Sequence, residues 1–480
     1  MRRGLWLAGM SMAMAGAFAW SMTASAAEDG LEHAALRLGV AGIASLEYQA
    51  HGRYYQFSQA PSPELPWPPF DVRDYVATLD FARGAVHARY HRVQVQEPGR
   101  ARPHSEATMD QYFVDGVTWN LGPGPTAMPA NLAERQAELW ASPQGFIKAA
   151  MTHQARVGSR NGSVTVSFRI GAYLYEGDLN PLGEVLAVRA AMPSAVLGDT
   201  PIEFRYSGYR DFDGVWFPSR IERRAGGFPW YELDVTAVRA NTAAAFAIPP
   251  VVAANPAPVA NQVVVTELAP GVFNFGGASH NSVVVEQAHG LVVIEAPLDE
   301  ARSLAVLAAI ERSFPGQPVR YVINTHAHFD HAGGLRTYVA RGATVVTHVR
   351  NAKYYRLAWQ APRTLEPDEL ARTARAPRFR TFTDRLVLAD AQRPIELHTI
   401  TGSGHNDAFA MAWLPKQKLL VEGDAWTPTP PGVKPPAVVN PLWLNLRDNI
   451  QRLGLDVERI QPLHGALQTR EDFARALLGP

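Results

Sequence analysis

The sequence predicts an α+β protein in which a mainly β N-terminal part precedes an α/β layered C-terminal part. Three observations support this prediction. Apolar and polar side chains alternate with a period of two in the first half of the chain, whereas strand-like and helix-like segments alternate in the second half. A proline-broken run separates the two halves.

The N-terminal part, residues 27–247, is predicted to consist mainly of strands. Residues 86–96, 163–170 and 202–209 alternate apolar or aromatic side chains with polar ones, as half-buried strands do. Residues 206–221, with the turn signal Asp213-Gly214, resemble the strand–turn–strand of half-open β-barrels of the lipoprotein-carrier type. The expected N-terminal fold is therefore half-barrel-like.

The boundary between the two parts is predicted at residues 248–261. This run contains Pro249, Pro250, Pro256 and Pro258 and has no regular periodicity, so it is interpreted as a semi-rigid linker. The C-terminal part then covers residues 262–480.

Residues 1–26 have the order of a secretory signal peptide. Arg2 and Arg3 precede an apolar run to about Trp20, and Ala24-Ser25-Ala26 forms a small-x-small cleavage site. The alternative is a membrane anchor, but the apolar run is short for a bilayer span. We expect an exported protein, periplasmic or secreted, with no stable membrane span.

Composition restricts the partners and the chemistry. The 480 residues include 45 Lys and Arg against 45 Asp and Glu and contain no basic run, which argues against nucleic acid and favours a small-molecule substrate. There is no cysteine, so disulfides, thiolate ligands, iron–sulfur clusters and a cysteine nucleophile are excluded. Any metal must be bound by imidazole and carboxylate groups.

The C-terminal part is predicted to alternate strands with helices. Strands are expected at residues 282–286, 291–295, 319–324 and 343–347, and helices at 299–314, with Asp299 as N-cap, and at 334–340. This alternation is typical of a layered α/β domain.

One short segment of this part contains four candidate metal ligands. His326, His328, Asp330 and His331 follow an apolar strand and precede two glycines. A strand end that turns into a loop can direct some of these side chains to one point and the others to a neighbouring point. Such a cluster predicts two metal ions close together. Imidazole and carboxylate suit Zn²⁺ best, with Fe or Mn also possible.

The pattern His-x-His-x-Asp-His resembles the signature of the metallo-β-lactamase-fold hydrolases. The resemblance continues through a third histidine beside glycines, His405, an acidic residue after a strand, Asp424, and a final His464. It implies an αββα sandwich for residues 262–480. It also implies one site from His326, His328 and His405, a second from Asp330, His331 and His464, and Asp424 shared between them.

The same resemblance implies a hydrolase with two Zn²⁺ per chain. The expected substrate is a small-molecule ester, lactone, amide or similar bond, attacked by metal-activated hydroxide, with Asp330 accepting a proton from the attacking water. Three alternatives stay open. They are a β-lactamase of the all-histidine/aspartate subclass, a mononuclear iron oxidoreductase of the persulfide-dioxygenase type, and a protein that binds a hydrophobic ligand.

Further candidates lie near the expected centre. His280 and His348 are predicted substrate-binding residues, although a loop-capping role for His280 is an equal interpretation. Glu295 and the pair Asn324-Thr325 flank the expected site and are expected to orient ligand imidazoles by hydrogen bonds.

Overall fold

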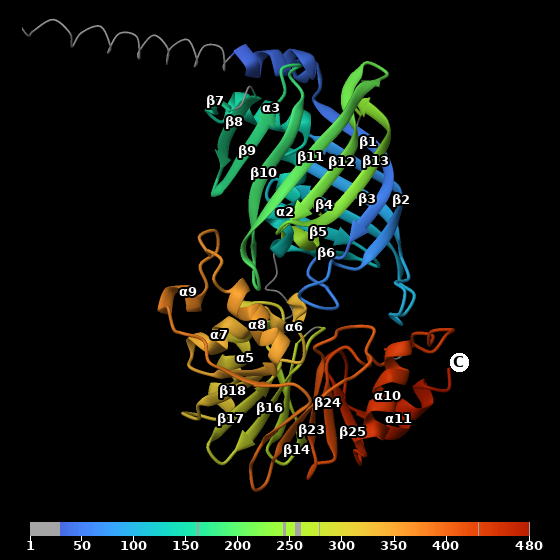
Figure 1. Cartoon of the computed structure of the whole chain (residues 1–480), viewed down its shortest axis with the longest axis vertical. Coiled ribbons are helices and arrows are strands. Elements are labelled where there is room, and N and C mark those ends of the chain that lie inside the picture. The colour runs from blue at the N-terminus through green and yellow to red at the C-terminus, as the bar shows by residue number, and fades with distance from the viewer. Residues whose placement is uncertain are drawn as a thin grey trace, which may run out of the picture.

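The computed structural model describes residues 29–160, 163–242, 246–254, 261–277, 279–430 and 432–479. The predicted signal peptide and residues 255–260 of the predicted linker lie outside these ranges. The chain forms two domains stacked along its long axis, with the N-terminal sheet above the C-terminal sandwich (Figure 1). No helix within the described ranges combines the length and the apolar character that a membrane crossing requires.

The N-terminal domain is one large antiparallel sheet. Its strands run in the order β6-β5-β4-β3-β2-β1-β13-β12-β11-β10-β9-β8-β7. They are β1 (Ser45–Tyr55), β2 (Pro69–Asp80), β3 (Ala85–Gln94), β4 (Glu106–Val114), β5 (Val117–Leu121), β6 (Pro125–Ala127), β7 (Arg156–Arg160), β8 (Ser163–Ile170), β9 (Tyr173–Leu179), β10 (Val185–Ser194), β11 (Gly198–Phe212), β12 (Val215–Ala225) and β13 (Phe228–Ala240). The described residues of this domain begin with a helical stretch at 29–37 and also form η1 (Val40–Gly42), η2 (Pro129–Asn131), α2 (Leu132–Trp140) and α3 (Pro143–Thr152), and α4 (Pro250–Ala253) follows in the predicted linker.

Apolar side chains of the curved sheet pack against α2 and α3. Phe146 and Ile147 of α3 are fully buried among strand residues such as Val188 and Phe217. The predicted strands are present, and the predicted strand–turn–strand is the β11–β12 hairpin, in which Phe212 pairs with Val215. The period-two pattern therefore predicted the positions of strands that bury one face against the helices of the core.

Part of the predicted linker is ordered and packed. Pro250–Ala253 forms one helical turn, α4, and Val252 is buried in a small cluster with Trp119 and Phe246 of the N-terminal domain. Pro250 is tolerated there because the first turn of a helix needs no N–H from it.

The C-terminal domain contains two sheets. The first has the order β14-β15-β16-β17-β18-β19-β20 and the second β21-β22-β23-β24-β25-β26. Their strands are β14 (Val264–Ala269), β15 (Val272–Gly276), β16 (Ser282–Gln287), β17 (Gly290–Ile294), β18 (Val319–Ile323), β19 (Thr344–His348), β20 (Phe379–Phe382), β21 (Arg385–Leu388), β22 (Ile395–Thr399), β23 (Ala410–Leu414), β24 (Leu419–Glu422), β25 (Arg459–Pro462) and β26 (Gln468–Thr469). The helices are α5 (Glu300–Ser313), α6 (Phe329–Ala332), α7 (Leu335–Ala340), α8 (Val349–Ala358), α9 (Glu369–Thr373), α10 (Pro441–Leu453) and α11 (Arg470–Ala476).

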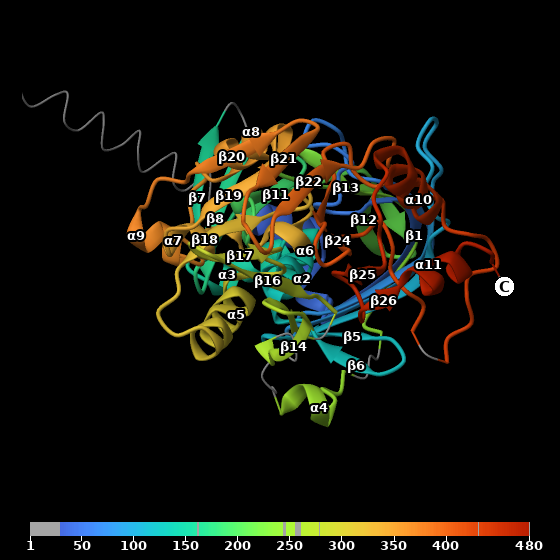
Figure 2. The same cartoon turned by 90° about the horizontal axis from the view of Figure 1, so that it is seen from below.

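Helices cover the outer face of each sheet, which confirms the predicted αββα sandwich. Val283 and Ile323 of the first sheet meet Leu397 and Val421 of the second in the core between them. A second core holds α5, α7 and α8 against the first sheet, and a third holds α10 and α11 against the second. Seen from below, α5 and α10 lie on opposite sides of the sheets (Figure 2).

The two domains contact each other through specific hydrogen bonds. Asp199, at the start of β11, accepts from the backbone N–H and the hydroxyl of Thr364, both at 2.7 Å. Arg363 donates to the carbonyl oxygens of Ser194 and Val196 at 3.1 and 3.0 Å. These bonds fix the β10–β11 turn on the loop between α8 and α9.

Candidate metal centre

The seven predicted metal ligands lie together at one edge of the sandwich. His326 and His328 follow β18, Asp330 and His331 lie on α6, and His405 lies between β22 and β23, whereas Asp424 follows β24 and His464 follows β25. The pairs β17–β18 and β24–β25 are parallel, so their carboxyl ends reach the same edge. Ligand sites of layered α/β domains commonly lie at such carboxyl ends.

Glycine is required at the end of the motif because the chain approaches its neighbours closely there. A Cβ on Gly333 would lie 1.7 Å from the carbonyl oxygen of Leu298, and one on Gly334 would lie 1.9 Å from the Ser303 hydroxyl. These contacts hold α6 and α7 against the start of α5, and they fix the backbone that carries Asp330 and His331.

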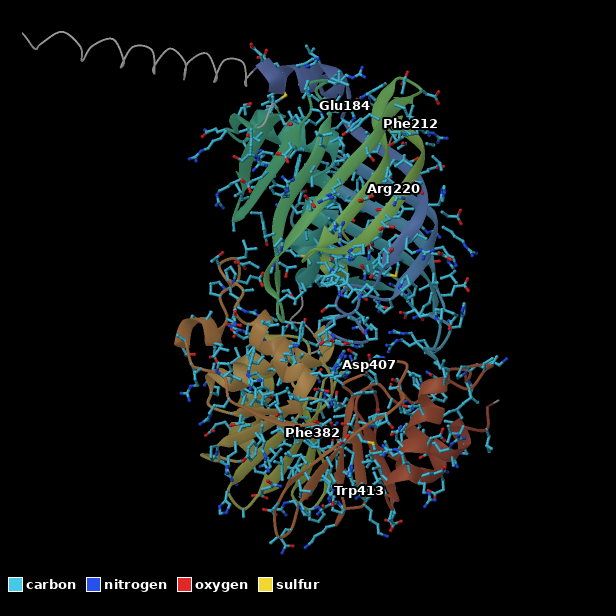
Figure 3. All side chains as sticks on the ribbon, in the orientation of Figure 1. Glu184, Phe212, Arg220, Phe382, Asp407 and Trp413 are labelled. Carbon is cyan, nitrogen blue, oxygen red and sulfur yellow. The ribbon has the colours of Figure 1, made fainter. Side chains whose placement is uncertain are left out.

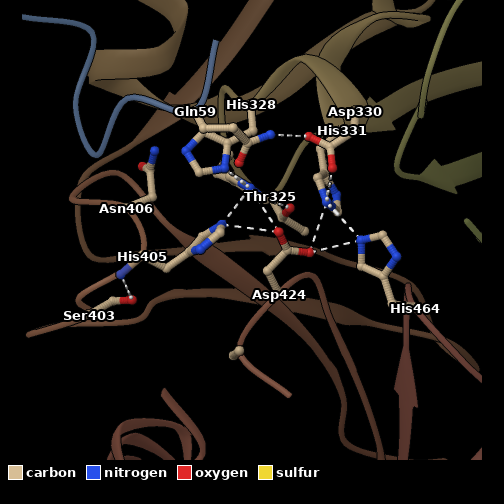
Figure 4. Close-up of polar contacts among 12 residues, drawn as sticks. Gln59, Thr325, His328, Asp330, His331, Ser403, His405, Asn406, Asp424 and His464 are labelled. Carbon is tan, nitrogen blue, oxygen red and sulfur yellow. Dashed lines mark hydrogen bonds and ion pairs between the residues drawn. The ribbon is translucent and has the colours of Figure 1, made fainter. Parts of the chain in front are cut away.

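The first group of donors is His326, His328, His405 and Asp424. Nε2 of His326 lies 3.0 Å from Nδ1 of His328 and 3.1 Å from Nε2 of His405. Oδ2 of Asp424 lies 3.0 Å from Nε2 of His405 (Figure 4). Four donor atoms therefore converge on one point.

The second group is His331, His464 and Asp330, with Asp424 again. Nε2 of His331 lies 3.2 Å from Nε2 of His464 and 3.8 Å from Oδ2 of Asp330. Oδ1 of Asp424 lies 2.8 Å from Nε2 of His331 and 3.0 Å from Nε2 of His464, yet this buried oxygen makes no hydrogen bond with either. The two oxygens of Asp424 thus face different histidine groups.

The donor set fits zinc. Zinc–nitrogen bonds of about 2.0–2.1 Å in a tetrahedral site place neighbouring nitrogens about 3.3–3.4 Å apart. The ring nitrogens of both groups approach this spacing, and the short contacts of Asp424 Oδ1 lack hydrogen-bond geometry.

Buried hydrogen bonds orient the ligand rings. Glu295 Oε2 accepts from Nδ1 of His331 at 3.0 Å and from the Thr325 hydroxyl at 2.6 Å. The Thr325 oxygen in turn lies 2.9 Å from Nδ1 of His326. Because both Nδ1 atoms donate, Nε2 of each ring keeps its lone pair for a metal. Asn324 also donates to Glu295 at 3.2 Å, so the expected orienting residues lie where the sequence analysis placed them.

The charge states also suit cation binding. Burial lowers the pKa of His326 well below its usual value and that of His328 to about 3, and neighbouring imidazoles add to the effect. Burial opposes ionisation of Asp424, but His331 and His405 outweigh it and hold the pKa of Asp424 well below its ordinary value. Burial likewise disfavours charged His331, yet Asp424 and Asp330 raise its pKa well above the usual value. His326 and His328 are therefore held in the neutral form and Asp424 in the ionised form, whereas the two carboxylates favour positive charge at His331, where a bound cation would supply that charge instead.

The two predicted substrate residues have different surroundings. His280 lies beside the second group: its ring centroid is 4.2 Å from that of His464, and its buried Nε2 lies 3.6 Å from Oδ2 of Asp330 without a hydrogen bond. His348 instead begins α8, where its Nδ1 accepts from the Arg350 N–H at 3.3 Å and its ring meets Phe382 edge-on. Its substrate role stays a prediction.

Two residues of the N-terminal domain reach the centre, and the sequence analysis missed both. In the loop between β1 and β2, Nε2 of Gln59 donates to Oδ1 of Asp330 at 2.8 Å, and the carbonyl oxygen of Ala60 accepts from Nε2 of His328 at 2.9 Å. The second bond leaves Nδ1 of His328 facing the first group. No motif marks this loop, which lies about 270 residues away in sequence.

The His405 loop is also held by the N-terminal domain. A Cβ on Gly404 would lie 1.8 Å from the carbonyl oxygen of Ala101. Asp407 accepts from Arg100 at 2.8 Å, and its N–H donates to the Pro61 carbonyl at 2.7 Å. Asp407 lies at the junction of the two domains (Figure 3).

Comparison with known proteins gives the class of the C-terminal domain. The family described as Metallo-beta-lactamase superfamily matches residues 275–464. The C-terminal region is therefore a metallo-β-lactamase superfamily domain, as the motif predicted, and it follows a large, mostly β N-terminal domain. No curated protein matches the chain.

The solved structures that resemble this chain include two metallo-beta-lactamases, each matched over 45% of this chain. The metallo-beta-lactamase from Pontibacter korlensis is 19% identical, with a TM-score of 0.35, and the match covers 45% of this chain and 98% of that one. The metallo-beta-lactamase FIM-1 from Pseudomonas aeruginosa, in its mono-zinc form, is 16% identical, with a TM-score of 0.33 and coverage of 45% and 93%.

Proposed function

We propose that the protein is a metal-dependent hydrolase with two zinc ions per chain. Its substrate would be a small molecule with an ester, lactone, amide or similar bond. The observation that supports this proposal most strongly is the position of Asp424, whose two buried oxygens each face a different group of histidines. A carboxylate in that position fits a ligand shared by two metal ions.

The residues would divide as the family resemblance implies. His326, His328 and His405 would hold one ion, Asp330, His331 and His464 the other, and Asp424 both. When bound, zinc lowers the pKa of water from about 15.7 toward 7, so that hydroxide is available at neutral pH.

The chain's own groups supply the rest of the chemistry. Asp330 would hold its ligand position and take the proton of the attacking water, because one of its oxygens remains free of Gln59. Gln59 fixes the rotation of that carboxylate, and Glu295 fixes the ring of His331. His280, beside Asp330 and His464, is placed to contact substrate.

Two further proposals concern export of the protein and ligand binding by its N-terminal domain. Export to the periplasm or outside the cell rests on the sequence of residues 1–26 alone. Hydrophobic-ligand binding by the N-terminal domain is the other alternative: the space between its sheet and α2 and α3 measures only about 30 Å³, but a largely apolar pocket of about 780 Å³ lies elsewhere in the domain, lined by residues such as Leu36, Phe81 and Trp140.

The test combines metal quantification with a substrate screen. Purified protein is expected to contain about two zinc ions per chain and to hydrolyse at least one of four classes: β-lactams, lactones, aryl esters and phosphodiesters. His326→Ala and Asp424→Ala should lose metal and turnover together, whereas His289→Ala, at an exposed position of the same domain, should lose neither.

Two results would contradict the proposal, and a third would narrow it. One iron per chain with oxygen uptake would indicate the dioxygenase-type alternative, with Fe in place of Zn. Turnover that survives metal removal in a variant combining His326→Ala and Asp424→Ala would show that the site is misassigned. Turnover of β-lactams alone would narrow the proposal to the β-lactamase subclass.

A further inference from the structure

A pocket of about 220 Å³ lies at the junction of the two domains, next to the metal centre. The N-terminal domain contributes Leu65, Trp67 and Phe228 to its wall, and the C-terminal domain contributes Ala327, His328 and Tyr354. Neither domain forms this pocket alone.

The wall is largely apolar and held in place. Trp67 packs edge-on against Phe57 with ring centroids 4.7 Å apart, and it lies 5.9 Å from the ring of Phe228. Three polar groups in the wall already have partners: Asp199 accepts from Thr364, the Thr200 hydroxyl donates to the Gly198 carbonyl, and Nε2 of His328 donates to the Ala60 carbonyl. A charged or strongly polar ligand would find few partners here, so the pocket favours an uncharged apolar group.

The pocket lies directly beside the metal centre. Ser58 and Ala60 line it, and Gln59 between them binds Asp330. His328 belongs to both places, since it lines the pocket and its Nδ1 lies 3.0 Å from Nε2 of His326. A substrate whose apolar group occupies the pocket would place its reacting bond at the metal centre.

The size of the pocket limits its occupant. A closed apolar cavity of about 150 Å³ holds benzene. A volume of about 220 Å³ therefore accommodates one aromatic ring or a short branched alkyl group, but no long acyl chain.

We infer that this interdomain pocket binds an uncharged, phenyl-sized apolar group of the substrate and so determines specificity. This inference rests on the proposed hydrolase function. Its physical basis is that one additional methylene group bound in a hydrophobic pocket raises the preference for a substrate by roughly 10–200-fold.

The first test measures binding without turnover. Fluorobenzene is titrated into the full-length, zinc-loaded protein and followed by ¹⁹F NMR. We expect saturable binding that falls at least about tenfold in Leu65→Trp, because the larger ring would fill the pocket. Leu65 is 40% exposed, so the variant should fold, and circular dichroism checks this.

A matched control is Leu182→Trp. Leu182 is 60% exposed and lies next to Glu184, which is at the far end of the N-terminal domain (Figure 3). This variant should bind fluorobenzene as the wild type does. Absence of saturable binding in the wild type, or equal binding by Leu65→Trp, would overturn the inference.

The second test compares two esters with the same leaving group. The wild type should prefer 4-nitrophenyl phenylacetate to 4-nitrophenyl acetate by at least about tenfold in kcat/KM, and Leu65→Trp should abolish this preference. Equal kcat/KM values in the wild type would overturn the inference while leaving the hydrolase function intact. If neither ester reacts, the fluorobenzene titration decides the inference, and the substrate screen separately decides the proposed function.

Discussion

Nε2 of Gln59 donates a hydrogen bond of 2.8 Å to Oδ1 of Asp330 across the junction between the two domains. The metal centre is thus built by the C-terminal domain but partly oriented by the N-terminal one. With Ala60 bound to His328, the β1–β2 loop contacts one ligand from each group.

Replacing Gln59 by Ala should weaken metal binding. Asp330 would lose the bond that fixes its rotation, and partners of this kind typically contribute 10–100-fold to metal affinity or activity. We expect a loss of about tenfold or more in affinity for the second zinc, measured by competition with a chelator. Gln56→Ala, in the same loop, is the control. Unchanged affinity in the Gln59 variant would show that the bond has no orienting role.

Gly404→Ala should disturb the junction. The added methyl group would overlap the Ala101 carbonyl, and the His405 loop or the β3–β4 loop would have to move. Overpacking of this kind costs about 1–3 kcal/mol, measured as the free energy of unfolding in urea, and zinc affinity should fall too. Gly122→Ala is the control, because its Cβ would meet nothing within 4 Å. Equal stability of both variants would contradict the close approach.

The partly buried pair Arg336–Asp368 should make stability depend on pH. Burial opposes ionisation of Asp368, but the hydrogen bonds from Arg336, at 2.9 Å for the longer one, and from the Ala371 N–H outweigh it and lower the pKa. A lowered folded-state pKa contributes stability above the ordinary value of about 3.9, and the contribution disappears as pH falls through the folded-state value.

Asp368→Asn should therefore cost about 1–3 kcal/mol of unfolding free energy between pH 5 and 7, because a charged hydrogen bond is lost. The difference in unfolding free energy between the variant and the wild type should become smaller below about pH 4. Urea unfolding in the presence of EDTA, which removes the metal contribution, measures both curves. Glu267→Gln, at an exposed position, should follow the wild type within about 0.5 kcal/mol. A difference in unfolding free energy that grows toward low pH would contradict a lowered pKa of Asp368.

Metal removal should destabilise the protein. Asp330 and Asp424 lie close together among the histidines, and a bound cation would relieve their repulsion. Zinc at 100 times its Kd should add about 2.7 kcal/mol for a single site. Thermal unfolding with zinc and with EDTA checks this, and Asp424→Ala should show a much smaller difference between the two conditions. An equal Tm in both conditions for the wild type would exclude the centre as a metal site.

The sequence predicted the elements whose signals are local. Asp299 caps α5 by accepting from the Arg302 N–H at 2.9 Å, and the four-ligand motif lies at the end of β18 as expected. Helix α10 begins at Pro441, where Asn440, by accepting from the Leu442 N–H, provides an N-cap that was not predicted.

What depends on contacts between distant segments was not predicted. Gln59, Ala60 and Arg100 carry no motif, and their roles come only from the docking of the N-terminal sheet on the sandwich. The ionised state of His331 also depends on carboxylates that only the fold brings close. The pocket at the junction of the two domains also depends on contacts between distant segments.

The central claim is that two metal ions share Asp424. Anomalous diffraction at the zinc absorption edge from zinc-loaded crystals tests it most directly. The account predicts two peaks about 3.5–4 Å apart, one among His326, His328 and His405 and the other among Asp330, His331 and His464, with one Asp424 oxygen toward each. A single peak, or two peaks with Asp424 turned away from both, would contradict it.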